Sequence, residues 1–241
     1  MAPDFSRRAT TPELMDAENV PFEDYRACLR DLATVNRLTL AYRPTLGFLT
    51  RLARSGRLSP HRPLSVVDVG CGYGDMLRRI GRWAQRRGIA VALVGLDLNP
   101  RAAKAAAAAT PGESRIRWHI GGFEQFRPEG GIDVVVSSLF GHHLDDAELI
   151  RFLAWMEATA RLGWLVNDLH RHPLPWAVFV AWSRAAGWHR FVRHDGPVSI
   201  TRAFVAGDWQ RSLAAAGIAD GAAQIEWRVP FRLCVSRLKA S

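Results

Sequence analysis

The sequence predicts an α/β fold in which a mostly parallel sheet of seven strands ends in an antiparallel hairpin. Three observations lead to this prediction. Short apolar runs alternate with helical patterns along the middle of the chain. Each run has the length of one buried strand and is bounded by glycine, proline or polar residues. Near the end of the chain, two further apolar segments turn at Pro230, which is typical of antiparallel neighbours.

The first part of the chain, residues 1–63, is predicted to be a tail followed by a helical cap. Residues 1–21 are mostly polar and are expected to be loose. A helical pattern of apolar residues covers residues 22–54, and Pro44 is expected to divide it into two helices. The main domain is then expected to occupy residues 64–241.

From residue 64 onward, strands and helices are expected to alternate, as they do around a parallel sheet with helices on both faces. The five expected strands are residues 64–69, 90–96, 116–120, 132–138 and 162–166. The helices between them are expected at residues 76–87, from Pro100 onward, and from an Asp145 cap to about residue 160. The pattern after the fifth strand predicts an inserted aromatic helix at 173–186, a polar loop at 188–202, a helix at 207–216, and strands at 224–228 and 231–237.

The composition is that of an ordinary globular protein, with 48% hydrophobic and 23% charged residues. The net charge of +9 suggests nucleic acid as a partner. However, the basic residues are almost all arginines and are scattered along the chain, which favours a solvated basic surface and no specific nucleic acid. No apolar run is long enough to span a membrane. Three widely spaced cysteines form no metal motif, so we expect no metal and a cytoplasmic protein. The oligomeric state is left open.

The strongest motif follows the first expected strand. Asp68 is followed by the glycine-rich turn Gly70-Cys-Gly-Tyr-Gly74, which runs into a helix. Glycines let a backbone approach a ligand closely, and the start of a helix offers unpaired N–H groups. Asp97 ends the next strand, where an acid accepts hydrogen bonds from the ribose hydroxyls of a nucleoside.

These residues resemble the class I methyltransferases that depend on S-adenosylmethionine (SAM), which have a Rossmann-like fold. The resemblance covers residues 64–170 best, and includes the strand at 94–98 and the segment at 132–144. The competing interpretation is a dinucleotide-binding enzyme, whose fingerprint is Gly-x-Gly-x-x-Gly. The spacing here is Gly-x-Gly-x-Gly with an acid two residues before it, which is the methyltransferase form.

The resemblance implies the contacts with the cofactor SAM. Gly70 and Gly72 are expected to pass beneath its methionine part, with Asp68 fixing the turn. Asp97 is expected to hold the ribose, and Leu98 to cover the adenine.

The adenine site departs from the family pattern. Many relatives have an acid after the third strand that accepts the adenine amino group, whereas this chain has Gly121-Gly-Phe123 there. Phe123 is expected to pack on the adenine instead.

Four histidines are candidates for the chemistry, because they follow the fourth and fifth strands, at the edge of the sheet where ligands bind in such folds. If the acceptor is a hydroxyl, it must lose a proton, and histidine is the usual base near neutral pH. We expect His143 first and His170 second to take that proton, with His142 and Asp168 as further candidates. The alternative for each is a packing or capping role.

Three functions are compatible with the sequence. The first is methylation of a small, largely apolar acceptor, such as the hydroxyl of a phenol, quinol or polyketide, with the aromatic helix as a lid. This reading resembles the ubiquinone- and natural-product-type enzymes. The second is an RNA or protein methyltransferase, although the Asn-Pro-Pro-Tyr motif of amino-methylating enzymes is replaced by Ser137-Ser-Leu-Phe140. The third is a protein that binds SAM without catalysis.

Overall fold

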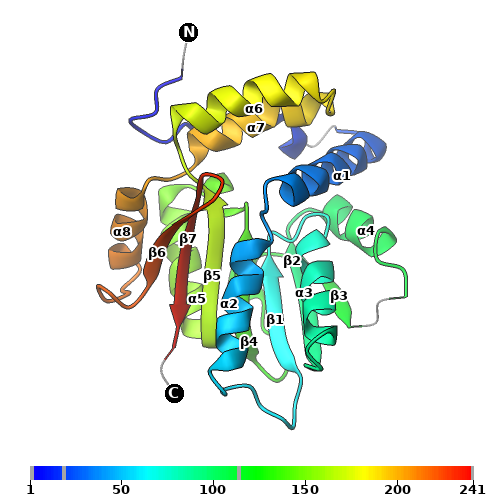
Figure 1. Ribbon diagram of the computed structural model, residues 1–241, viewed down its shortest axis with the longest axis vertical. Coiled ribbons are helices and arrows are strands. Elements are labelled where there is room, and N and C mark those ends of the chain that lie inside the picture. The colour runs from blue at the N-terminus through cyan, green and yellow to red at the C-terminus, as the bar shows by residue number, and fades with distance from the viewer. Residues whose placement is uncertain (1–2, 18–19, 113–114, 240–241) are drawn as a thin grey trace.

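The computed structural model describes residues 3–17, 20–112 and 115–239, which form a seven-stranded sheet with helices on both faces (Figure 1). The strand order is β3-β2-β1-β4-β5-β7-β6. The strands are β1 (Leu64–Val69), β2 (Val91–Asp97), β3 (Ile116–Ile120), β4 (Ile132–Ser138), β5 (Ala160–Leu169), β6 (Gln224–Arg228) and β7 (Arg232–Leu238). The first five are parallel, while β7 is antiparallel to both of its neighbours, so the predicted fold class is confirmed.

The helices agree with the prediction in most places. They are α1 (Phe22–Leu38), α2 (Arg43–Arg54), α3 (Asp75–Gln85), α4 (Pro100–Ala108), α5 (Asp146–Thr159), α6 (Pro173–Ala185), α7 (Arg190–Arg202) and α8 (Ala206–Ala215). Three short 3-10 helices are η1 (Leu14–Asp16), η2 (Phe123–Gln125) and η3 (Gly141–His143). The expected cap at Asp145 is present, because its carboxylate accepts the backbone N–H of Glu148 at 2.7 Å.

The core is divided between the two faces of the sheet. On one face α5 and α8 pack against the sheet around the buried side chains of Phe152, Trp164 and Trp209. On the other face α2 and α3 bury Phe48 and Ile80. These two layers hold the sheet rigid, so the loops that follow its strands are attached to a fixed frame.

The two helices α6 and α7 lie together across the carboxyl ends of the strands (Figure 1). Gly196 of α7 lets them approach, because a Cβ there would lie 2.1 Å from a ring carbon of Phe179. We call this helix pair the lid. A third apolar cluster, which includes Tyr25 of α1 with Phe191 and Val192 of α7, joins the lid to the N-terminal helices.

Two expectations about this region were wrong. Residues 188–202 were expected to be a polar loop, but most of them form α7. The helix buries Asp195 and Ser199 on the same face as Ile200. Polar residues thus occupy buried positions, and the sequence lacks the regular apolar spacing that would predict a helix. Residues 1–21 were expected to be loose, but Ala9 donates a backbone hydrogen bond to Thr201, and Glu13 and Met15 are buried against the lid.

Within the described ranges, no helix is both long and apolar enough to cross a membrane.

Candidate active site

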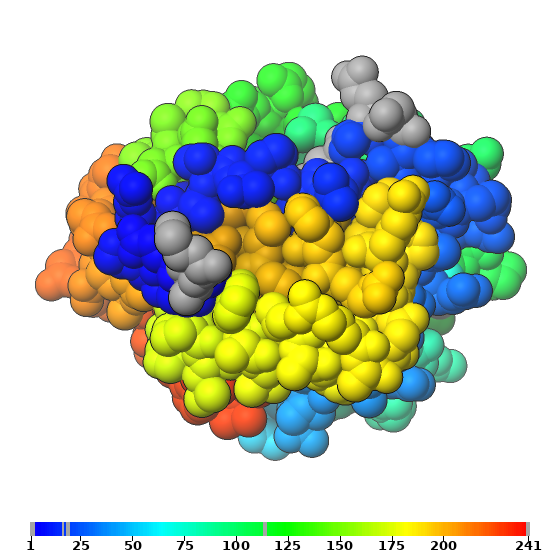
Figure 2. Space-filling model, turned by 90° about the horizontal axis from the view of Figure 1, so that it is seen from above, coloured from blue at the N-terminus to red at the C-terminus, as the bar shows by residue number. Residues whose placement is uncertain are grey.

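A cavity of about 750 Å³ lies between the carboxyl ends of the strands and the lid. Its floor includes the glycine turn after β1 and the segments that follow β2, β4 and β5, while α1, α6 and α7 contribute its walls. Figure 2 shows the lid helices, in yellow and orange, beside the blue N-terminal segment on the face above the sheet. The volume is within the range of pockets that enclose small molecules.

The glycine turn takes a shape that other residues do not tolerate. Gly70 has φ of +71°, and a Cβ on it would lie 2.4 Å from the ring of Phe140. Gly74 has φ of +70°, and a Cβ there would lie 2.2 Å from the ring of Trp118. The chain therefore turns tightly from β1 into the start of α3, and Gly70 and Gly72 bring its backbone to the edge of the cavity.

Asp97 fixes this turn from the end of β2. One of its carboxylate oxygens accepts the N–H of Gly72 at 2.9 Å, and the other accepts the N–H of Asn99 at 2.9 Å. The side chain is half-buried and lines the cavity. Two predicted cofactor residues, Gly72 and Asp97, are thus joined directly.

Asp68 lies behind the turn and is 2% exposed. Among the described residues its Oδ1 has no hydrogen-bond partner. Burial, and then the charges of Asp75 and Asp97, raise the pKa of Asp68 well above its usual range. Asp75 and Asp97 border the same part of the cavity, and their carboxyl groups favour a positively charged ligand there.

Tyr42 from the N-terminal cap completes this corner. Its hydroxyl donates a hydrogen bond of 2.6 Å to Asp75. Burial and the charge of Asp75 raise the pKa of Tyr42, so the hydroxyl stays protonated and remains a donor.

The two residues predicted to contact adenine, Leu98 and Phe123, both line the cavity. The Leu98 side chain is 70% exposed and also borders the cavity. Phe123 lies against Phe152 and Trp155, with ring centres 5.0 and 5.6 Å away. Gln125 of η2 lines the cavity as well, and it is a polar group that the sequence interpretation did not include.

His142 is held by Asp168. The two side chains are 3% and 0% exposed, and His142 Nδ1 lies 2.6 Å from an Asp168 oxygen. The backbone N–H of His142 donates to the second oxygen at 3.0 Å. Burial opposes the charge of Asp168, but His142 and two backbone N–H groups outweigh it and hold the pKa of Asp168 below its usual value. Asp168 is not among the residues that line the cavity, and its contacts orient His142.

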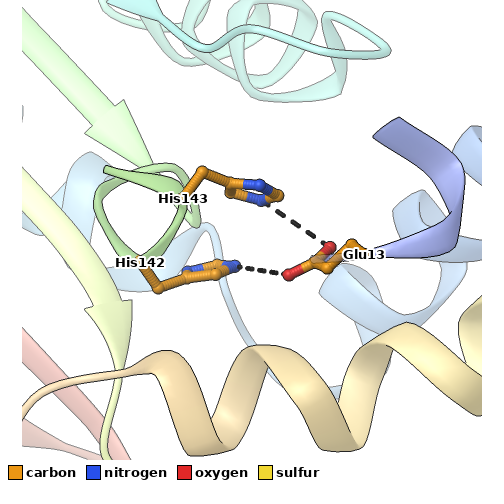
Figure 3. Close-up of side chains that lie close together, drawn as sticks. All are labelled: Glu13, His142 and His143. Carbon is orange, nitrogen blue, oxygen red and sulfur yellow. Dashed lines mark ion pairs between the residues drawn. The ribbon is translucent and has the colours of Figure 1, made fainter. Parts of the chain in front are cut away.

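His143 is beside His142, with ring centres 4.5 Å apart, and both rings face Glu13 (Figure 3). The Nε2 atoms of His142 and His143 lie 3.7 and 3.8 Å from the two carboxylate oxygens of Glu13. All three side chains line the cavity. The sequence interpretation missed Glu13, because it comes from the tail that was expected to be loose.

His170 follows β5 and lines another part of the cavity. Its Nδ1 is buried and has no hydrogen-bond partner among the described residues. Burial, followed by the positive charges of His172 and Arg171, lowers the pKa of His170. The neighbouring His172 has a different role, because its Nδ1 accepts the N–H of Leu174 at 3.1 Å and caps α6.

The strand order, the glycine turn after β1 and the acid after β2 form one α/β site at the carboxyl edge of the sheet. Residues 66–163 match a protein family described as "Methyltransferase domain". A search of curated proteins finds no match.

Solved structures share the fold at low sequence identity. An O-methyltransferase family protein from Burkholderia thailandensis is 15% identical with a TM-score of 0.59, over 90% of this chain and 60% of that one. The CMeT domain of the citrinin polyketide synthase is 13% identical with a TM-score of 0.57, over 82% and 52%. The magnesium protoporphyrin IX methyltransferase of Synechocystis PCC 6803, with bound S-adenosylhomocysteine (SAH), is 14% identical with a TM-score of 0.54, over 83% and 84%. The chain thus spans only 52% and 60% of the length of the first two.

Proposed function

We propose that this protein transfers a methyl group from SAM to a hydroxyl of a small, largely apolar acceptor. The observation that carries the proposal is the shared cavity. The glycine turn with Asp97, the histidines after β4 and β5, and the lid all border one space of about 750 Å³.

The residues present fit SAM. The glycine turn leaves a cradle of bare backbone, and the carboxyl groups of Asp68, Asp75 and Asp97 border it. Bound SAM supplies a methyl group on a positively charged sulfonium. In this arrangement Gly70 and Gly72 lie beneath the methionine part, Asp97 accepts the ribose hydroxyls, and Leu98 and Phe123 cover the adenine. The buried, unpartnered oxygen of Asp68 is compensated when a cation occupies the neighbouring space.

The lid supports an apolar acceptor. Val178, Phe179 and Trp182 of α6 and Ile200 of α7 line the cavity. Apolar side chains exclude water from the acceptor, while polar groups at the strand ends orient its hydroxyl. Two of the structural neighbours act on aromatic molecules by their names, N-acetylserotonin and magnesium protoporphyrin IX. We expect a phenol, quinol or polyketide hydroxyl here.

The proton of the acceptor is assigned to a histidine. The geometry favours His170 over His143, reversing the order expected from the sequence. His170 lines the cavity, and its lowered pKa keeps it neutral and able to accept a proton at pH 7. His143 instead faces the carboxylate of Glu13. The three described cysteines are buried thiols, which is compatible with the cytoplasm that we propose as its location.

The proposal is tested in two steps with the full chain. Isothermal titration with SAM, SAH and NAD should show binding of the first two only. Transfer from labelled SAM is then measured with a panel of phenols, quinols and alkylresorcinols, with the corresponding methyl ethers as controls that have no hydroxyl. Binding of NAD without SAH would refute the proposal, as would methylation confined to amines or to RNA.

A further inference from the structure

Glu13, His142 and His143 come from distant parts of the chain and meet at the cavity wall. Glu13 precedes η1, whereas the two histidines end η3 after β4. One nitrogen or oxygen from each of the three lies within 4.8 Å of the others. The Glu13 and His142 side chains are each 3% exposed, and that of His143 is 27% exposed. Figure 3 shows both rings directed at the same carboxylate.

The hydrogen bond between His142 Nδ1 and Asp168 leaves the second ring nitrogen, Nε2, facing Glu13. The Asp168 carboxylate accepts the backbone N–H groups of His142 and Leu169 at 3.0 and 2.7 Å, and it faces His142 Nδ1 at 2.6 Å as the acceptor for that ring. The proton between them is therefore on His142 Nδ1. In the neutral ring, Nε2 then carries a lone pair that points at the carboxylate of Glu13, 3.7 Å away and shielded from water. A buried lone pair facing a buried carboxylate is satisfied by a proton on Nε2 or by a cation bound between the two groups.

The contacts of Glu13 and His142 are also those expected of metal ligands. A histidine that binds a metal usually donates its other ring N–H to a carboxylate, which fixes the ring. His142 does this with Asp168, and the Ser199 hydroxyl donates to a Glu13 oxygen at 2.7 Å, which fixes that carboxylate. Ligand atoms about 2.1 Å from a tetrahedral zinc ion are about 3.4 Å apart. The two Nε2 atoms lie 3.7 and 3.8 Å from different oxygens of Glu13, and one ligand atom from each of the three residues lies within 4.8 Å of the others, so the three atoms must draw closer together to hold a zinc ion.

We propose that Glu13, His142 and His143 bind a divalent transition-metal ion, with Zn²⁺ as the best match. Two imidazoles and one carboxylate suit zinc better than magnesium, which prefers oxygen ligands. Three protein ligands leave a coordination position open, as in catalytic zinc sites, and here it faces the cavity.

A role for the ion in catalysis rests on the proposed function, whereas metal binding itself does not. An acceptor hydroxyl bound to the ion becomes more acidic, because the cation stabilises its conjugate base. A weak base then suffices to take its proton. Specificity follows as well, since an acceptor with an oxygen at the open position is preferred.

The test is metal binding by the full chain. Protein stripped with a chelator is dialysed against Zn²⁺ and its metal content is measured by mass spectrometry. Separately, Co²⁺ is titrated and its visible absorption is recorded, because the spectrum reports nitrogen and oxygen ligands directly. We expect one ion per chain. Losing a carboxylate that only supports a metal ligand typically lowers the metal affinity by about 10- to 100-fold. Glu13→Gln and His143→Ala change the ligands themselves, so each should lower the metal affinity by more than that.

Two controls separate the possible outcomes. His61→Ala removes an exposed histidine and should retain the metal, and circular dichroism shows whether each variant folds. Asp168→Asn should weaken binding by about 10- to 100-fold. SAH titration of His61→Ala should match the wild type. If the wild type binds SAH but retains no Zn²⁺ or Co²⁺, or if the ligand variants bind them equally well, the metal site is refuted. If it binds Zn²⁺ but not SAH, the proposed function fails and the metal site stands.

Discussion

Asp97→Ala should weaken SAH binding without unfolding the protein. The Asp97 carboxylate accepts two backbone N–H groups at 2.9 Å each, from Gly72 and Asn99, and lines the cavity. Under the proposed function it also accepts the ribose hydroxyls. Truncation removes the ribose contact and loosens the glycine turn. Leaving polar partners unmatched costs about 1–3 kcal/mol, which corresponds to an affinity about 5- to 150-fold lower.

Isothermal titration with SAH measures this loss directly, and thermal unfolding without ligand measures any general destabilisation. Asp220→Ala is the matched control, because Asp220 is exposed in the turn before β6 and should leave both values unchanged. If Asp97→Ala binds SAH as tightly as the wild type, the ribose is held elsewhere. The assignment of this strand end to the cofactor is then wrong.

Three further predictions follow from the same geometry. His170→Ala should lower kcat by about 100- to 10,000-fold while SAH affinity is retained. The pH profile of the wild type is a second test. Since the pKa of His170 lies below its usual 6.5, kcat should stay constant on acidification through pH 6.5 and fall only below it. Asp68→Asn should weaken SAH binding but raise the Tm of the ligand-free protein at neutral pH. The pKa of Asp68 is raised in the folded protein, so its contribution to stability is present at acid pH and is lost as the pH rises through that pKa. A lower Tm for the variant would contradict this. Affinity for RNA, measured by salt titration, should collapse between low and physiological salt, and a sequence-selective complex at physiological salt would show instead that the basic surface is specific.

The sheet could be predicted from the sequence because its signals are local. A run such as Ile132–Ser138 is apolar throughout, and the glycines after β1 mark a turn that only glycine accommodates. The strand-end position of His142 and His170 also follows from the alternation of strands and helices. These parts of the site depend on neighbours in sequence, or on the rule that parallel strands end at one edge of the sheet.

The lid and Glu13 could not be predicted, because their signals are distant contacts. The apolar spacing of α7 is interrupted by Asp195, which is buried only because the N–H groups of Leu14 and Met15 donate to it at 2.8 and 3.0 Å. The N-terminal segment is in turn ordered by the lid. Taken alone, the sequence of α7 and that of the N-terminal segment each predict a polar loop. In the structure each segment supplies hydrogen bonds that allow the other to be buried.

Because the lid and the N-terminal segment depend on each other, the same docking that covers the cavity also brings Glu13 to His142 and His143. Arg8 ties the N-terminal segment to the carbonyl of Leu144 at 2.8 Å and to Asp146 at 2.6 Å, while Asp195 ties it to the lid. Met15 is also buried in the apolar cluster with Phe191 and Val192, so undocking the segment would break polar and apolar contacts together. Glu13 leaves with the segment, whereas His142 stays fixed to Asp168 on the sheet. Any chemistry that needs the carboxylate beside the two histidines is therefore restricted to the docked state, in which the acceptor is shielded from water.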